Sequence, residues 1–266
     1  MRGAVYYSVQ EAERNHAFIA DLQNEAEKLN IGLELLTEPP NTTYDFLLFR
    51  DRNPALARQL EKSDCRLFNR AAVNEIANDK LRTFELASLL GIPAVPTFRA
   101  DKRLPDLPFV LKTRNGHGGS EVFLCSTQSE ANEVLSQFHP NELIAQPFID
   151  SHSQDVRVFV LGDEVLGAVK RTGDAESFKS NYTLGGTIEK YTLDGTQTKQ
   201  VQTIARAIKS DYIGIDFLLP VHGGWQLNEI EDPVGARSLY ATHDFSVAEK
   251  LMAYIQRQLK KTGPAN

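Results

Sequence analysis

The stretch DYIGIDFLLPVHGGWQLNEIEDPVGAR, residues 211–237, contains two apolar runs of strand length on either side of a Gly-Gly turn. This pattern predicts a β-hairpin. If residues 222–223 form its two-residue tip, antiparallel register places Asp216 opposite Glu229, and Glu231 opposite a glycine. Because strand side chains alternate between the two faces, the three carboxylates then share one face.

Three carboxylates this close repel one another unless they keep their protons or share a cation. Oxygen-only ligands favour a hard ion such as Mg²⁺, which in proteins usually keeps water and substrate phosphate as further ligands. The alternative is an exposed edge hairpin with ordinary acidic residues. The remainder of the chain has to separate these two interpretations.

The composition is that of an ordinary globular protein. Of the 266 residues, 41% are hydrophobic and 24% are charged, which suffices for one large domain or two to three small ones. The formal net charge of -6 argues against general binding to nucleic acid or to an anionic membrane, because both need an excess of Lys and Arg. A local basic patch remains open.

The two cysteines, Cys65 and Cys125, lie outside any CxxC pattern and predict neither a disulfide scaffold nor a zinc site. We expect reduced thiols. The apolar stretch at residues 4–9 is too short for a signal-peptide core or a membrane span. These features predict a cytoplasmic protein.

The first part of the chain predicts a small α/β unit. Apolar runs predict strands at residues 4–8, 31–36, 46–49 and 66–68, and helical spacing predicts helices at 11–29 and 54–60. A glycine-rich phosphate loop does not follow the first strand, which argues against a dinucleotide-binding unit. A longer helix is predicted at 71–90, with Lys80 in its middle. Such a lysine is ordinarily a solvated charge.

A strand ending in Lys112 precedes the glycine-rich segment 115–120, and a second strand is predicted at 121–126. Glycines allow positive φ and close backbone approach, so such a tip can fold over phosphates and donate N–H groups to them. A plain flexible loop is the alternative. The segment fits neither the P-loop pattern nor GxGxxG, since Glu121 stands at the last glycine position of the latter.

Residues 155–171 give the strongest hairpin signal in the chain, with a Gly-Asp turn between two apolar runs. In the register that this turn predicts, Asp155 lies opposite Lys170, so both share a face with Arg157, while Arg171 points to the other face. A cross-strand salt bridge would explain Asp155 and Lys170 simply. Arg157 on a largely apolar strand is harder to explain in that way.

The remaining segments complete the outline. An apolar strand is predicted at 143–149, at an edge or ending at Pro147, which has no N–H to donate. The polar, glycine-rich loop 172–186 is either a surface loop or a binding loop. Amphipathic helices are predicted at 197–208 and 245–259.

The ordered set of these features resembles the ATP-grasp superfamily, and most closely its RimK-like branch of glutamate and amino-acid ligases. The resemblance covers roughly residues 68–235, with a weaker match for the preceding unit. It implies a small N-terminal α/β domain at 1–70, followed by two α+β subdomains, at 71–150 and 151–266, that clasp the nucleotide between them. Together these make a mixed α/β and α+β ATP-grasp fold.

The resemblance also implies how the nucleotide is held. Lys80 and Lys112 match the lysines that hold the ATP phosphates. The mobile loop that closes over the phosphates matches Gly118, Gly119 and Ser120. The linker whose backbone bonds adenine matches Gln146, Phe148 and Ile149, and Asp155 matches the ribose or nucleotide contact. The loop that approaches the nucleotide and the reacting carboxylate matches Lys179, Ser180 and Asn181.

Asp216, Glu229 and Glu231 match the family's Mg²⁺ ligands, with two ions expected and Mn²⁺ as an alternative metal. The sequence departs from the family pattern at three places. Pro147 stands where relatives usually carry an acidic residue, which puts the adenine contact in doubt. Glu231 is commonly Asn, and its charge would tighten metal binding or mark a subgroup. The Asp-Pro-Val-Gly sequence that follows differs from the usual Ser-Pro-Gly ending.

The function implied by the resemblance is an ATP-dependent carboxylate–amine ligase that acts through an acyl phosphate and uses small-molecule acid and amine substrates. Arg157 or Arg171 would stabilise charge on the reacting groups. An ATP-grasp small-molecule kinase and a nucleotide-binding module without turnover are the alternatives. Arg237 is a candidate to hold a substrate carboxylate, with an exposed surface arginine as the simpler interpretation. The sequence names neither the acid nor the amine, and it leaves the oligomeric state open, a homo-oligomer included.

Overall fold

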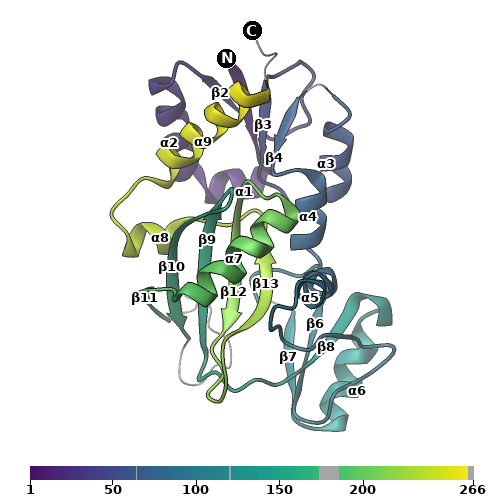
Figure 1. The fold of residues 1–266 in the computed structure, drawn as a ribbon. Helices are drawn as coiled ribbons and strands as arrows, with labels where there is room; N and C mark the ends of the chain where they lie inside the picture. Colours follow the sequence, from purple (N-terminus) through teal and green to yellow (C-terminus); the bar gives the residue numbers. More distant parts are fainter. Residues whose placement is uncertain (64, 120, 174–185, 263–266) are drawn as a thin grey trace.

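The computed structural model describes residues 1–63, 65–119, 121–173 and 186–262, and arranges their strands in three sheets (Figure 1). One sheet is parallel and two are antiparallel, with helices packed on them. The mixed α/β and α+β fold class is therefore confirmed. None of the described helices is both long and apolar enough to cross a membrane.

The N-terminal sheet has the order β2-β1-β3-β4 and is parallel throughout. Its strands are β1 (Arg2–Tyr6), β2 (Gly32–Leu36), β3 (Phe46–Phe49) and β4 (Arg66–Phe68). Helices α1 (Val9–Arg14), α2 (His16–Lys28) and α3 (Pro54–Leu60) connect them. The expected single helix over 11–29 is interrupted at Asn15, which ends α1 and precedes α2. Apolar cores lie on both faces of the sheet, as is usual for parallel sheets.

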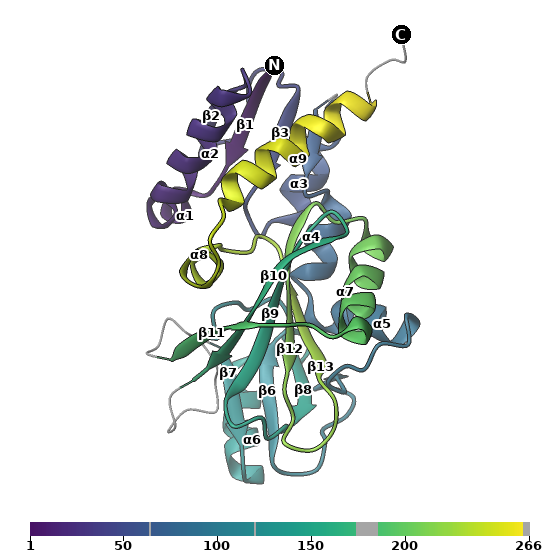
Figure 2. The ribbon, with the colours of Figure 1, turned by 60° about the vertical axis from the view of Figure 1, so that its left-hand side comes forward.

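The C-terminal helix α9 (Val247–Thr262) packs against α2 and joins the core of the N-terminal sheet (Figures 1 and 2). Leu22 and Ala26 of α2 share this core with Leu251 and Ile255 of α9, and all four are fully buried. Helix α9 thus completes the core of the N-terminal unit. The division into three domains at 1–70, 71–150 and 151–266 stays a prediction.

The expected long helix over 71–90 is wrong, because the structure has two helices there, α4 (Ala71–Ala77) and α5 (Lys80–Leu89). Asp79 causes the break, since its side chain caps the N-terminus of α5 by accepting from the Leu81 and Arg82 backbone N–H groups. Lys80 is therefore the first residue of α5 and not a mid-helix surface position. Only 7% of it is exposed, so the solvated-charge interpretation is also wrong.

The smallest sheet has the order β5-β8-β6-β7. Its strands are β5 (Phe98–Arg99), β6 (Phe109–Thr113), β7 (Val122–Cys125) and β8 (Leu143–Pro147), with α6 (Gln128–Gln137) and the 3-10 helix η1 (Pro140–Glu142) between β7 and β8. As the proline predicts, β8 ends at Pro147. The glycine-rich segment lies between β6 and β7 in the chain, and its residues 116–119 line a cleft together with residues of the central sheet.

The central sheet has the order β11-β10-β9-β12-β13. Its strands are β9 (Gln154–Leu161), β10 (Glu164–Thr172), β11 (Thr187–Tyr191), β12 (Tyr212–Leu218) and β13 (Gln226–Glu231), and its helices are α7 (Gly195–Ile208) and α8 (Arg237–Thr242). Helix α7 lies across one face (Figures 1 and 2), where Val201 and Ile204 pack with Val158 and Ile215. Because side chains alternate along each strand, the polar residues between these apolar ones lie on the opposite face.

The predicted register of β12 and β13 is confirmed at the three carboxylates, since Asp216 lies opposite Glu229 and Gly214 lies opposite Glu231. The two-residue tip is wrong, because β12 ends at Leu218 and β13 begins only at Gln226. A register shift next to Asp216 makes up the difference. It leaves Asn228 as an extra residue between the paired positions of β13.

The predicted register of β9 and β10 is wrong by one residue, because a bulge lies between Val165 and Gly167. Asp155 therefore lies opposite Arg171 and not opposite Lys170. Arg171 thus shares a face with Asp155 and Arg157, while Lys170 points away and pairs with Glu189 on β11 at 3.0 Å.

Candidate active site

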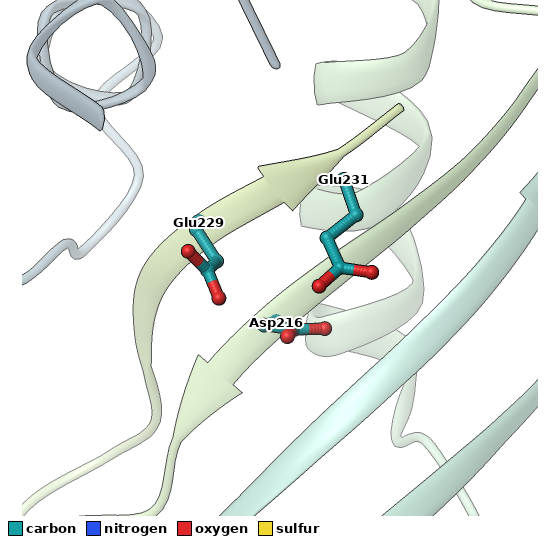
Figure 3. A group of neighbouring side chains, drawn as sticks. All are labelled: Asp216, Glu229 and Glu231. Carbon is teal, nitrogen blue, oxygen red and sulfur yellow. The ribbon is translucent and has the colours of Figure 1, made fainter. Parts of the chain in front are cut away.

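Three carboxylates converge on the β12–β13 hairpin, one from β12 and two from β13 (Figure 3). Asp216, Glu229 and Glu231 each offer an oxygen atom, and these three atoms lie within 4.8 Å of one another. The register explains this arrangement, since Asp216 faces Glu229 directly and Glu231 follows two residues further on the same face. The sequence therefore located a genuine acidic cluster.

Two arginines from the neighbouring hairpin neutralise much of this negative charge. Arg157 donates to both oxygens of Asp216, from Nε at 2.7 Å and from Nη2 at 2.6 Å, and its Nη2 lies 2.6 Å from Glu231 Oε1. Arg171 donates from Nη2 to Asp216 at 2.8 Å. Burial would raise the pKa of the Asp216 carboxyl, but the two arginines outweigh burial and lower that pKa to about 2. Burial raises the pKa of Glu231, which Arg157 opposes.

The same arginines extend the ion pairs to Asp155, which is 3% exposed. Arg171 Nε and Nη2 each donate to one Asp155 carboxylate oxygen at 2.6 Å. Asp155, expected to contact the nucleotide, thus supports Arg171 through a bidentate pair. Gly214, next to these residues on β12, allows the close approach of Val234, because a Cβ there would lie 2.6 Å from Val234 Cγ2, whereas Arg157 Cδ would be in ordinary contact at 3.6 Å.

Two buried lysines face the acidic cluster from the other side. Lys112 at the end of β6 donates to Asn228 Oδ1 at 3.0 Å, and burial lowers its pKa to about 8. Lys80 Nζ lies 3.8 Å from Glu229 Oε2 and also donates to the Gly116 carbonyl. Positive groups on α5 and β6 thus lie opposite negative groups on β12 and β13, which is an arrangement suited to a metal-bound polyphosphate.

A cleft runs between the smallest sheet and the central sheet, and most of the predicted nucleotide-binding residues line it. These are Lys80, Lys112, Gly118, Gly119, Gln146, Phe148, Ile149 and Asp155, together with Arg171, Glu229 and Glu231. Arg157 lines an adjoining cavity instead, and Asp216 lies beneath the surface with 1% exposure. Ser120, Lys179, Ser180 and Asn181 lie outside the described residues.

Two features of the cleft bear on the predicted roles of the glycine-rich loop and of the adenine linker. Gly118 and Gly119 have φ values of 68° and 75°, which side chains rarely adopt, so the loop over the cleft needs glycine at both positions. The Phe148 N–H donates to the Pro108 carbonyl at 3.1 Å. This N–H is therefore engaged within the protein, and an adenine contact at the linker has to use another group.

Several residues of the site carried no recognisable signal in the sequence. Asn228 reaches Lys112 only because of the bulge in β13. Arg14, Arg50 and Arg52 come from the N-terminal unit and line the cavity that adjoins the cleft. Hydrophobic periodicity indicates only which residues of one helix or strand share a face. These arginines reach the central sheet through tertiary packing, which periodicity does not predict.

The donor set fits a hard divalent cation, since carboxylate oxygens are the ligands that Mg²⁺ prefers. Asp216, Glu229 and Glu231 would hold it. A cation there has to compete with Arg157 for Asp216 and Glu231, because that guanidinium already contacts both. Nucleotide phosphates near Lys80 and Lys112 would supply the remaining oxygen ligands.

Comparison with known proteins identifies the class. Residues 100–255 match the model of the RimK-like ATP-grasp domain. A probable alpha-L-glutamate ligase 1 from Shewanella sp. (strain ANA-3) is 30% identical over 217 residues, which cover 77% of this chain and 72% of that protein. An uncharacterized protein, MG011, from Mycoplasma genitalium is 26% identical over 267 residues, covering 97% and 93% of the two chains.

Solved structures agree on the fold. D-cycloserine synthetase DcsG has a TM-score of 0.77 at 15% identity and covers 97% of this chain and 100% of its own. A D-alanine–D-alanine ligase from Bacillus anthracis has a TM-score of 0.76 at 16% identity and covers 99% and 100%. The fold is thus the ATP-grasp fold of C–N bond-forming ligases. The chain belongs to the RimK-like ATP-grasp domain family, as the sequence motifs predict.

Proposed function

We propose that the protein is an ATP-dependent carboxylate–amine ligase that activates an acid as its acyl phosphate and releases ADP and phosphate. One observation carries this proposal. Asp216, Glu229 and Glu231 converge within 4.8 Å, and Lys80 and Lys112 line one cleft with Glu229 and Glu231. This is an arrangement for placing a metal-bound triphosphate beside a reacting group.

The chemistry requires activation of the acid. An amine cannot displace oxide from a carboxylate. If a carboxylate oxygen attacks the γ-phosphorus of ATP, the bond to the β-phosphate oxygen breaks and ADP leaves. The amine then attacks the carbonyl carbon of the acyl phosphate, the C–O bond to phosphate breaks, and the nitrogen loses a proton. Mg²⁺ supplies neutralisation of charge on the phosphates.

Each of the charged residues has a distinct place in this scheme. Lys80 and Lys112 bind the phosphates that are transferred and released. Arg171 lines both the cleft and the adjoining cavity, so it can contact the phosphoryl group and the acid together. Arg157 lines the cavity and stabilises negative charge on the reacting carbonyl. Asp155 is a positioning residue, since it orients Arg171 through two hydrogen bonds.

The proposal is tested by following ADP and hydroxamate with Mg²⁺-ATP, a panel of acids and hydroxylamine as a small amine. Acyl phosphate formation predicts both products in equal amounts. A stable phosphorylated product without hydroxamate would identify a kinase, and ATP binding without ADP release for any acid or amine would identify a nucleotide-binding module. Either result would contradict the ligase.

A pair of variants locates the activity. Glu229→Gln keeps the shape of a predicted metal ligand and is expected to lower turnover on the order of 10²–10³-fold, because the charge that holds the metal is lost. Glu189→Gln is the control, since Glu189 is 64% exposed on the same sheet and pairs with Lys170. Equal activity of both variants would place the active site elsewhere.

A further inference from the structure

A second cavity adjoins the nucleotide cleft and has a different character. It has a volume of about 740 Å³ and lies between the N-terminal unit and the central sheet. Arg171, Glu231, His117 and Gly118 line both hollows, so the two meet beside the acidic cluster. A molecule in the cavity can therefore present one end to the γ-phosphate position, and the volume suits a small organic substrate.

Arginine dominates the lining of this cavity. Six arginines face two glutamates there: Arg14, Arg50, Arg52, Arg157, Arg171 and Arg237 against Glu11 and Glu231. Three of the arginines are already compensated. Arg14 Nη1 lies 2.9 Å from Glu11 Oε1, and Arg157 and Arg171 belong to the ion pairs around Asp216.

The other three arginines have no ion pair with any described residue. Arg50 is 3% exposed, yet its partners are neutral: Nε donates to the Tyr7 hydroxyl at 3.1 Å and Nη2 to the Val234 carbonyl at 2.6 Å. The buried Asp232 carboxylate stabilises this charge without forming an ion pair with it, so Arg50 can still bind an anion in the cavity. Arg50 therefore contributes a buried positive charge to the wall of the cavity.

Arg52 and Arg237 add two guanidinium groups that line the cavity and not the cleft. Arg52 follows β3 in the N-terminal unit, and Arg237 opens α8 after β13. Arg52 lies close enough to His117 of the glycine-rich loop to lower the pKa of that imidazole, although burial is the larger cause. The positively charged part of the cavity thus reaches His117 of the glycine-rich loop.

We infer that the acid substrate carries a second anionic group, a carboxylate or a phosphate, and that Arg52 and Arg237 select for it. The inference rests on the proposed ligase activity. The reacting carboxylate lies where the cavity meets the cleft, beside Arg171 and Glu231, and the second anionic group is bound by Arg52 and Arg237. Guanidinium groups suit this role because they bind carboxylate and phosphate through two parallel hydrogen bonds. A neutral group at that end would leave Arg52 and Arg237 without an ion-pair partner among the described residues.

The test compares acids that differ only in the remote charge. Succinate is paired with succinamate, glutarate with glutaramate, aspartate with asparagine, glutamate with glutamine, and phosphoserine with serine. Affinity for each acid is measured by calorimetry with Mg²⁺-ADP bound, and turnover by ADP release with hydroxylamine. At least one dianionic acid is expected to bind about tenfold or more tightly than its partner, as expected for a lost charge-assisted hydrogen bond.

Variants assign the preference to the two arginines. Arg52→Gln and Arg237→Gln are each expected to weaken binding of the dianionic acid about tenfold, and to leave affinity for the monoanionic partner and for ATP unchanged. Arg206→Gln is the control, because Arg206 pairs with Asp163 on the exposed surface. Circular dichroism melting curves verify that each variant is folded.

The outcomes separate the two proposals. Turnover of monoanionic and dianionic acids with equal efficiency would overturn this inference and leave the ligase intact. Binding of a dianionic acid that depends on Arg52 and Arg237, without ADP release, would support the cavity and contradict the ligase. Failure of every dianionic acid to bind, or binding that neither variant weakens, would overturn the inference.

Discussion

The nucleotide cleft adjoins the cavity lined by six arginines, and the two share Arg171 and Glu231. They differ in volume and in how far their charged side chains are paired. The cleft has a volume of about 140 Å³, against about 740 Å³ for the cavity. Its charged side chains Arg171, Asp155, Glu229 and Glu231 each belong to an ion pair. The cavity is roomy and has arginines without an ion pair to any described residue. Ligand pockets usually measure 300–1,000 Å³, and of the two hollows it is the cavity that falls within this range.

The two hollows also differ in which part of the chain supplies them. All residues that line the cleft, except Lys80 and Val95, fall within the matched family domain at 100–255. The cavity takes six lining residues from the N-terminal unit, outside that domain: Tyr7, Glu11, Arg14, Asn15, Arg50 and Arg52. The difference suggests that the family domain carries the phosphoryl chemistry, while the N-terminal unit contributes to the choice of acid.

The largest effect is expected where the paired charges of the cleft are broken. Asp216→Ala removes the shared partner of Arg157 and Arg171, so that Arg157 keeps only Glu231 and Arg171 keeps only Asp155 as an ion-pair partner. We expect a loss of about 3–5 kcal/mol in the free energy of unfolding, measured by urea denaturation. Asp163→Ala, which removes the exposed partner of Arg206, should cost less than about 1 kcal/mol. Similar losses for the two variants would contradict the buried network.

The next effect distinguishes the hollows by ligand. Lys112→Ala should weaken ATP binding by about 1.5–3 kcal/mol, because a charge-assisted contact to phosphate is lost. Affinity for the acid should not change. Calorimetric titration with each ligand measures both, and Lys170→Ala serves as a control, since Lys170 points away from the site and pairs with Glu189. An equal loss of acid affinity would show that the two hollows do not act separately.

A smaller effect is expected from blocking the close approach of Val234 to Gly214 on β12. Gly214→Ala places a Cβ 2.6 Å from Val234 Cγ2, and we expect a loss of about 1–3 kcal/mol in unfolding free energy from overpacking. Gly224→Ala is the matched control in the connecting loop, where a Cβ meets no atom within 4 Å. Wild-type stability of Gly214→Ala would show that this close approach is unimportant.

The smallest effect is a pH dependence confined to the cleft. Burial lowers the pKa of Lys112 to about 8, so this lysine is charged at pH 7 and loses its proton as the pH rises through 8. ATP affinity should then fall, by at most about 1.4 kcal/mol per pH unit above 8. In Lys112→Arg the guanidinium stays charged and the fall should disappear. The same pH profile in both proteins would assign the titration to another group.

Local sequence rules predicted the parts of the site that lie on one hairpin. The carboxylates of β12 and β13 were located because the pairing near Asp216 follows from strand alternation. The same reasoning misplaced Arg171, since the β9–β10 bulge shifts the register by one residue. It also missed the end of α4, because an Asp79 side-chain cap outweighs continuous helical periodicity there.

The arginine-lined cavity could not be predicted from strand alternation or helical periodicity. Arg14 lies on α1, and Arg50 and Arg52 lie in the loop that follows β3, all far along the chain from Arg237. Only the packing of the N-terminal unit on the central sheet brings them together. Arg237 itself was identified as a candidate for holding a carboxylate, and an isolated exposed arginine could not be distinguished from it by sequence alone.

The most direct test of the account follows an oxygen atom. An acid that supports ADP release is labelled with ¹⁸O in its carboxylate and is incubated with Mg²⁺-ATP and an amine, and the released phosphate is examined by mass spectrometry. An acyl phosphate requires that one labelled oxygen leave the acid with phosphate, so the account predicts one ¹⁸O atom in each phosphate for each amide formed. Amide formation with unlabelled phosphate would contradict it.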